Sequence, residues 1–246
     1  MNIILLLTFI GIISLYKIYV NSNKNISANL ILENVYIHIL LGLIISSITA
    51  LTIDKHTNVI KKIDSYSGLI GSFILSMISL FMVMTAGNNK FLQYFGFVVF
   101  MLSIGILIHP YVTLLKYNGK GVKIFLTLIA IIGILSLIAY KLPNMFIGWG
   151  TYLMFGLMSL IIIEIIDLIF GSHEGIRSRS KLYGWVGIIL FSGFILYDSQ
   201  RLLEKANVGQ ILSEQITSKD VNYPALSLSL YLDVLNLFSS LTNVTS

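Results

Sequence analysis

Two aspartates lie in otherwise apolar sequence near the end of the chain. Asp198 falls within GFILYDSQRLL and Asp233 within SLYLDVLNLF. An ionisable group at the centre of a membrane helix costs at least about 2.5–3.5 kcal/mol on insertion scales, so such a residue usually faces the interior of a helix bundle and serves a function. Two carboxyls held close together in a poorly solvated site cannot both ionise cheaply, and they take up and release protons as a unit. The pair is therefore a candidate pH sensor on an ion pathway.

The same two carboxyls are the candidate metal ligands. Carboxylate oxygens suit Ca²⁺, but two side chains fall far short of its usual 6–8 oxygen ligands, so water or carbonyl groups would have to complete the shell. This favours a weak, transient calcium site at Asp198 and Asp233, with Ca²⁺ as the permeant ion. The chain has no cysteine, and we find no metal-ligand spacing, phosphate-binding loop or nucleophile elbow. We therefore expect neither a cofactor nor an enzyme.

Asp233 lies at the centre of a polar stripe. Ser229, Asn236 and Ser240 stand four residues before it, three after it and seven after it, which places all four side chains on one helical face. A seam of hydrogen bonds between helices would need only the serines and the asparagine. The carboxyl near mid-membrane favours a functional role, with the stripe as its polar support.

Asp198 has two possible partners. It could pair with Arg201 three residues later, which would contribute only tenths of a kcal/mol. The segment 182–203 and the final apolar segment should run antiparallel, because they are joined by 204–222. Both aspartates then lie toward the same membrane side and can meet, and three glycines (Gly184, Gly187 and Gly193) would let a neighbouring helix pack closely.

Other ionisable residues admit simpler interpretations. Glu164 and Asp167 could mark a second mouth of the same route, at the opposite end, or could be interfacial residues that end a helix. His109 precedes Pro110, which kinks or ends helices, and it and His38 are most readily explained as satisfied interfacial groups.

Composition identifies the elements that must hold these residues. The chain of 246 residues is 56% hydrophobic and 11% charged, with a mean hydropathy of +0.88, whereas soluble domains carry about 25% charged residues. A bilayer-spanning helix needs about 20 mainly apolar residues. Eight segments approach or meet this length: 3–20, 35–53, 66–86, 91–115, 122–140, 145–170, 182–203 and 223–244. We predict an all-α polytopic membrane helix bundle.

The distribution of charged residues indicates a lipid bilayer as partner, but it says little about the orientation of the helices in the membrane. The net charge of +5 falls in short connections between apolar segments, which is typical of membrane-flanking residues, so we expect a lipid bilayer and no nucleic acid as partner. Nine basic residues fall on one side of an eight-span arrangement and seven on the other, too even to set the orientation. A signal peptide begins with basic residues, and the 3–20 segment has none before it. We therefore expect this segment to be a retained helix.

Two short motifs resemble an enzyme family. Tyr197-Asp198 and the triplet Pro224-Ala225-Leu226 are similar to elements of the presenilin-type intramembrane aspartyl proteases, and a carboxyl dyad can hydrolyse peptide bonds. In that family the second aspartate lies in GxGD, whereas Asp233 lies in LYLD, and the PAL triplet follows both aspartates rather than falling between them.

Longer segments resemble the transmembrane Bax-inhibitor-motif family. LYGWVGIILFSGFILYDSQRLLEKA (182–206) and YPALSLSLYLDVLNLFSSL (223–241) are similar to its closing two helices, with their YDTQ-like and LYLDxxNLF elements. DLIFGS (167–172) is similar to the segment before them, and NVYIHILLGL (34–43) and GFVVFMLSIGILIHP (96–110) are looser matches.

This resemblance implies a seven-helix domain over 34–246, preceded by an additional helix and connector over 1–33. It also implies a pH-sensitive calcium leak of an intracellular membrane, with Asp198 and Asp233 as sensor aspartates. The implied location is the endoplasmic reticulum or Golgi in a eukaryotic or viral setting, or the inner membrane in a bacterium, with 204–222 in the cytosol. Suppression of apoptosis through membrane-protein partners in cell-death signalling is a further expectation. The alternatives are an intramembrane aspartyl protease and a non-conducting platform that regulates a partner.

Overall fold

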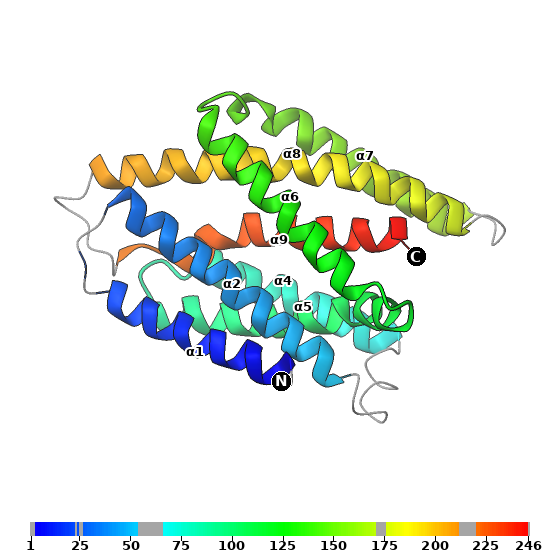
Figure 1. Ribbon diagram of the computed structural model, residues 1–246, viewed down its shortest axis with the longest axis horizontal. Coiled ribbons are helices and arrows are strands. Elements are labelled where there is room, and N and C mark those ends of the chain that lie inside the picture. The colour runs from blue at the N-terminus through cyan, green and yellow to red at the C-terminus, as the bar shows by residue number, and fades with distance from the viewer. Residues whose placement is uncertain are drawn as a thin grey trace. The chain divides into compact units, whose positions relative to one another are not determined.

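The computed structural model describes residues 3–22, 24, 27–53, 66–170, 176–211 and 220–245. All regular secondary structure in these ranges is helical (Figure 1). The elements are α1 (Ile3–Asn21), α2 (Ala28–Ile53), α4 (Tyr66–Thr85), α5 (Lys90–Tyr117), α6 (Gly121–Lys141), the 3-10 helix η1 (Ile147–Trp149), α7 (Gly150–Phe170), α8 (Ile176–Ile211) and α9 (Tyr223–Thr245). Within the described ranges, eight helices are long and apolar enough to cross a membrane. The predicted all-α polytopic fold is confirmed.

The second helix begins earlier than the apolar pattern indicates. We predicted a start at 35, but α2 begins at Ala28. The Ser27 hydroxyl accepts a hydrogen bond from the Leu30 amide at 3.2 Å, as an N-terminal cap does. Glu33 pairs with Lys17 of α1 at 2.5 Å. Because α1 supplies a partner for this acidic residue, the helix can extend through polar sequence.

The fifth helix continues past its proline. Pro110 lies inside α5, which ends only at Tyr117, so the helix runs through the proline as the predicted segment 91–115 does. A proline removes one backbone hydrogen bond from a helix, and the rest of this long helix remains. His109 is buried, and its Nδ1 donates to the Ala50 carbonyl at 3.1 Å, so it is a satisfied structural group.

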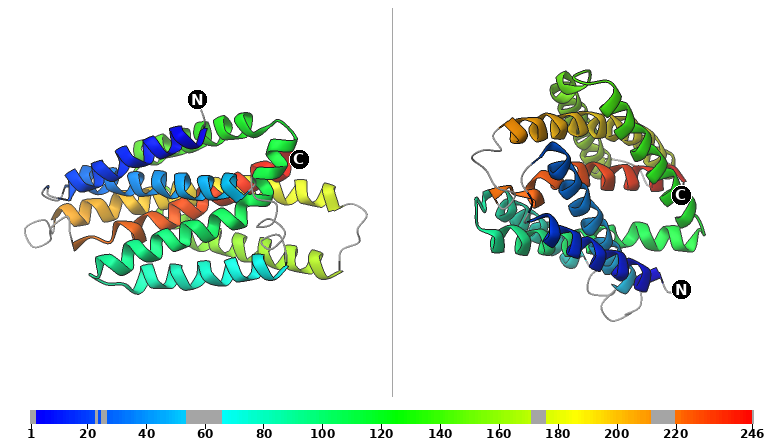
Figure 2. Two further views of the ribbon diagram at one scale, coloured as in Figure 1. Left: turned by 90° about the horizontal axis from the view of Figure 1, so that it is seen from below. Right: turned by 60° about the vertical axis from the view of Figure 1, so that its left-hand side comes forward.

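The chain divides into two compact units, 1–113 with 204–231 and 114–203 with 232–246. Within the first unit, α2 and α5 pack closely, because a Cβ added to Gly105 would lie 2.5 Å from Thr49. The helices α4 and α5 form an antiparallel hairpin (Figure 2), and a Cβ on Gly96 would lie 2.8 Å from Val83. Small residues therefore set the helix separations in this unit.

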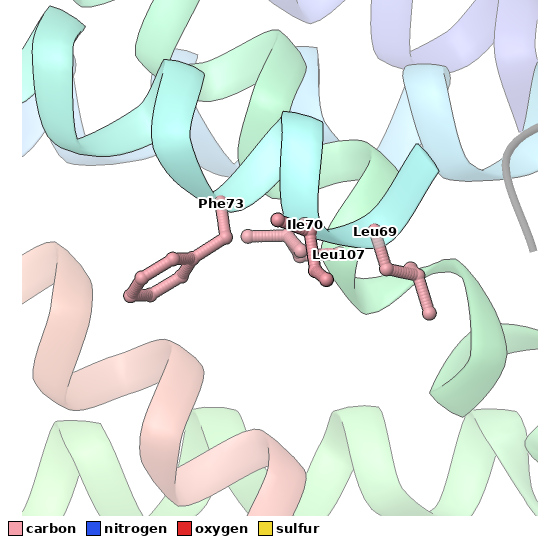
Figure 3. Close-up of a pocket in the computed structure, with 4 residues that line it drawn as sticks. All are labelled: Leu69, Ile70, Phe73 and Leu107. Atoms are coloured by element: carbon pink, nitrogen blue, oxygen red, sulfur yellow. The ribbon is translucent and has the colours of Figure 1, made fainter. Parts of the chain in front are cut away.

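The first unit also carries an apolar groove of about 390 Å³. Figure 3 shows its lining: Leu69, Ile70 and Phe73 of α4, and Leu107 of α5. None of these side chains can ligate a cation or exchange a proton. The groove therefore suits hydrocarbon, as expected for a surface within membrane-spanning helices, and it includes none of the predicted site residues.

The second unit contains α6, α7, most of α8 and the end of α9. A Cβ on Gly184 would lie 2.8 Å from the Ser240 carbonyl oxygen, and one on Gly187 would overlap the Ser240 side chain. Gly193 faces Leu153 of α7 instead, at 2.7 Å. The predicted close packing at these glycines is confirmed, but it involves two neighbouring helices rather than one. Gly184 and Gly187 pack against α9, and Gly193 packs against α7.

Candidate functional site: a buried aspartate pair

The structure brings Asp198 of α8 and Asp233 of α9 together within the second unit. The two residues are 9% and 7% exposed, and their carboxyls are joined by a hydrogen bond. Asp233 lies midway along α9, and Asp198 lies in the second half of α8. The alternative partner Arg201 is exposed. Of the two arrangements left open by the sequence, the carboxyl pair is therefore the one that the structure contains.

A hydrogen bond between two carboxyls requires a proton, because an ionised carboxylate can only accept. A contact of this kind therefore needs a pair that holds at least one proton. Two full negative charges 4 Å apart repel by about 4 kcal/mol at an effective dielectric constant of 20. The contact therefore has two possible states, one joined through a proton and one in which the charges separate or bind a cation.

Oxygen atoms without hydrogen-bond partners occur in this unit. Among the described residues, Asp233 Oδ2, Ser199 Oγ and Ser136 Oγ are buried and accept no hydrogen bond from the protein. Buried polar atoms are nearly always satisfied, so each of these oxygens has spare capacity for a water molecule or a cation. Over the same ranges no group of three or more His, Cys, Asp or Glu side chains could hold a metal ion.

The polar stripe of α9 is only partly enclosed. Ser240 is buried like Asp233, and Asn236 is half-buried, whereas Ser229 is exposed. Ser240 fits against Gly187, so the stripe faces α8 over its second half. Ser229 shares the helical face of Asp233 but lies at a level where no neighbour covers it.

The predicted second acidic pair has a different character. Asp167 forms an ion pair with Arg179, whose Nε lies 2.8 and 3.0 Å from the two carboxylate oxygens. Tyr183 also hydrogen-bonds to Asp167. Glu164 is exposed on α7. Asp167 thus joins α7 to α8, and a role for Glu164 and Asp167 at a second mouth stays a prediction.

One residue of this site was missed from the sequence. Gln200, two positions after Asp198, is 2% exposed. Its Oε1 accepts from the Phe146 amide at 2.7 Å, and its Nε2 donates to the carbonyls of Ala139, at 3.3 Å, and of Leu142. The signal was Pro143, which lacks an N–H and so leaves the Ala139 carbonyl without its usual donor four residues later.

A second buried titratable residue lies in the first unit. His38 is 1% exposed and lies among the rings of Tyr94, Phe97 and Tyr223, at centroid distances of 5.7–6.0 Å. Its Nδ1 donates to the Asn34 carbonyl at 2.6 Å, and Nε2 has no hydrogen-bond partner among the described residues. Aromatic side chains thus enclose the imidazole, and its position at the membrane interface stays a prediction.

Eight apolar helices and a carboxyl pair buried between two of them define a polytopic integral membrane protein with an intramembrane acidic centre. The family described as "Inhibitor of apoptosis-promoting Bax1" matches residues 28–245. The chain therefore belongs to this Bax-inhibitor family, which confirms the resemblance found in its closing helices. The family is not a known family of enzymes.

Individual relatives are mostly bacterial. An uncharacterized protein of Caulobacter vibrioides is 33% identical over 131 residues, 52% of this chain and 49% of that protein. The inner membrane protein YbhL of Escherichia coli is 27% identical over 123 residues, 49% of each chain. Bax inhibitor 1 of Saccharomyces cerevisiae is 28% identical over 98 residues, 40% of this chain and 27% of that protein. The matches thus span about half or less of these relatives.

Proposed function

We propose that this protein is a pH-sensitive, calcium-permeable leak channel whose gate is the Asp198–Asp233 pair. The observation that supports the proposal is the hydrogen bond between two buried carboxyls on adjacent membrane-spanning helices. This contact exists only while the pair holds a proton. Losing that proton changes how α8 and α9 interact, and a change between membrane helices is what opens or closes a path.

The proposed permeant ion is Ca²⁺, bound weakly and in passing. The doubly ionised pair presents hard carboxylate oxygens, which suit Ca²⁺. Asp233 Oδ2 and Ser199 Oγ, which have no hydrogen-bond partner in the described part of the chain, would add one charged and one neutral ligand. Conduction needs binding strong enough to admit the ion and weak enough to release it, and an incomplete ligand set meets both conditions.

Membrane and cellular role follow from the relatives by analogy. The name of the E. coli relative places that protein in the inner membrane, and we propose this location for a bacterial source. For a eukaryotic or viral source we propose the endoplasmic reticulum or Golgi, where a calcium leak would lower stored calcium. Inhibition of apoptosis, through membrane-protein partners, is proposed on the family description alone.

Calcium flux from liposomes tests the proposal. The purified protein is reconstituted with an enclosed calcium indicator, and flux is measured over a series of pH values. We expect flux that depends on pH in the natural protein. The Asp198→Asn/Asp233→Asn variant should show one flux at every pH, equal to the natural protein's low-pH limit, because asparagine cannot ionise. Glu204→Gln removes an exposed carboxyl from the same helix and serves as the matched control.

Three outcomes separate the candidate functions. Flux whose pH dependence survives in the double variant contradicts the aspartate gate. Absence of flux at any pH favours the non-conducting platform. Cleavage of membrane-embedded model peptides, lost in either single aspartate variant, would favour the intramembrane protease, since the same pair could perform acid–base hydrolysis.

A further inference from the structure

The Gln200 side chain occupies a break in the backbone hydrogen bonding of another helix. Helix α6 ends at Lys141, and the last helical bond joins the Leu142 amide to the Ile138 carbonyl at 3.0 Å. The Ala139 carbonyl would next receive the amide of residue 143, which is a proline. Gln200 Nε2 donates to that carbonyl instead. A side chain of α8 thus replaces a backbone donor that the sequence of α6 lacks.

The same carboxamide also binds the other side of the α6–α7 connection. Its oxygen accepts the Phe146 amide at 2.7 Å, and its nitrogen also reaches the Leu142 carbonyl. All its hydrogen-bonding groups are therefore used, and none of the partners is titratable. At 2% exposure, water cannot replace these bonds, so the attachment persists whatever the pH.

One turn of α8 therefore carries two attachments of different kinds. Tyr197 holds the start of α7, since a Cβ on Gly150 would lie 2.7 Å from the Tyr197 hydroxyl oxygen. Gln200 holds the segment before it. Between them, Asp198 faces Asp233 of α9 through a contact that needs a proton. The attachment to the α6–α7 connection uses no titratable group, whereas the contact with α9 joins two carboxyls.

We propose that Gln200 is a positioning residue that fastens the α6–α7 connection to α8, so that the two move together. The consequence for ion flux rests on the proposed function, but the fastening itself does not. Gly184 and Gly187 fit tightly against Ser240. This tight fit holds α8 against α9 at the level of Ser240, so α8 and the attached connection would pivot there.

Distance measurements between spin labels test the fastening directly. The chain contains no cysteine, so two introduced cysteines can be labelled without labelling any natural residue. Labels at Met145→Cys and Ile189→Cys report on the connection and on α8, because these residues are 59% and 74% exposed. In reconstituted protein we expect one narrow distance distribution that does not change with pH. Gln200→Leu should lose the single narrow distribution and make the distance vary with pH.

Two further variants serve as controls. Ser199→Ala removes a neighbouring buried hydroxyl that has no hydrogen-bond partner among the described residues, and it should leave the distribution narrow. Gln200→Glu keeps the size of the side chain but loses both donors when ionised, so it should broaden the distribution even if Gln200→Leu fails to fold. In the flux assay, Gln200→Glu should shift the midpoint of the pH profile, whereas Glu204→Gln, which removes an exposed carboxyl from the same helix, should not.

The outcomes separate this inference from the proposed function. A narrow distribution in both Gln200 variants, or a pH-dependent distance in the natural protein, overturns the fastening. Flux without pH dependence in every variant overturns the proposed gate and leaves the distance result to decide on Gln200.

Discussion

The two units each contain a buried polar centre, and the centres differ in what satisfies them. In the first unit, Gln93 donates to the Gly87 carbonyl at 2.5 Å, and Asn222 donates to the Val83 carbonyl at 3.0 Å. These partners belong to the backbone, and they close the turn between α4 and α5 and fasten the start of α9. Such bonds have one stable arrangement, because neither partner changes its charge.

In the centre of the second unit, each buried aspartate has the other aspartate as its partner. Asp198 and Asp233 satisfy one another only through a proton, and one oxygen of Asp233 has no hydrogen-bond partner among the described residues. The comparison teaches that buried polar residues in a membrane bundle hold the structure when neutral groups satisfy them. They give it two states when two of them share an exchangeable proton.

The largest effect should come from ionising the aspartate pair. The natural protein should lose up to about 4 kcal/mol of unfolding free energy as pH rises and both carboxyls become charged, because like charges then face one another. The stabilisation is present where the pair holds its proton and is lost at higher pH. Thermal unfolding in lipid nanodiscs over a pH series measures this. Asp198→Asn/Asp233→Asn should unfold at a temperature far less dependent on pH. Equal pH dependence in both proteins would contradict the two-state interpretation.

A smaller loss is expected from the centre in the first unit. Gln93→Leu should lower the unfolding free energy by about 2 kcal/mol, because the Gly87 carbonyl and the Lys90 ammonium each lose a buried partner. Asn88→Ala, in the same turn and exposed, should change it little. The pH dependence of calcium flux should survive Gln93→Leu. Loss of the pH dependence in Gln93→Leu would show that the centre in the first unit also controls the flux, which contradicts the comparison.

The glycine seam should show a smaller effect still. Gly187→Ala should cost about 1 kcal/mol relative to Gly133→Ala, because its new methyl group would overlap Ser240, whereas a Cβ on Gly133 meets nothing within 4 Å. Chemical denaturation of the two variants side by side provides the comparison. Equal stability would mean that α8 and α9 are not in close contact at this level.

The smallest effect is expected at His38. His38→Phe keeps the contacts with the surrounding rings and removes two nitrogens: Nε2, which has no hydrogen-bond partner among the described residues, and Nδ1, which bonds to a carbonyl of its own helix. The unfolding free energy should change by less than about 1 kcal/mol. Flux should remain pH-dependent, and a flux profile that becomes flat would transfer the pH sensor from the aspartates to this histidine.

The sequence predicted the spans and the pair well, because both depend on strong local signals. Long apolar runs fix membrane helices almost by length alone, and the predicted 66–86 and 223–244 segments differ from α4 and α9 by one residue each. The aspartates stand out because a carboxyl in such a run is costly. The antiparallel course of the two helices, joined by 204–222, then indicated that the aspartates could meet.

The remaining features depend on how the helices pack. The exposure of Ser229 could not be predicted, because the helical face is readable from the sequence but the extent of the neighbouring helix is not. Gly193 shares a helix with Gly187, yet they contact different partners. The role of Gln200 required knowing that α6 ends beside α8 at Pro143. The division of the chain into a helix over 1–33 and a domain over 34–246 stays a prediction.

Infrared spectroscopy of the reconstituted protein tests the central claim most directly, by observing the carboxyl proton itself. The difference spectrum between the natural protein and Asp198→Asn/Asp233→Asn should contain the C=O stretch of a protonated carboxyl. That band should disappear as pH rises, over the same range in which calcium flux changes. A difference spectrum without this band, or a band that titrates apart from the flux, would contradict a gate built on a shared proton.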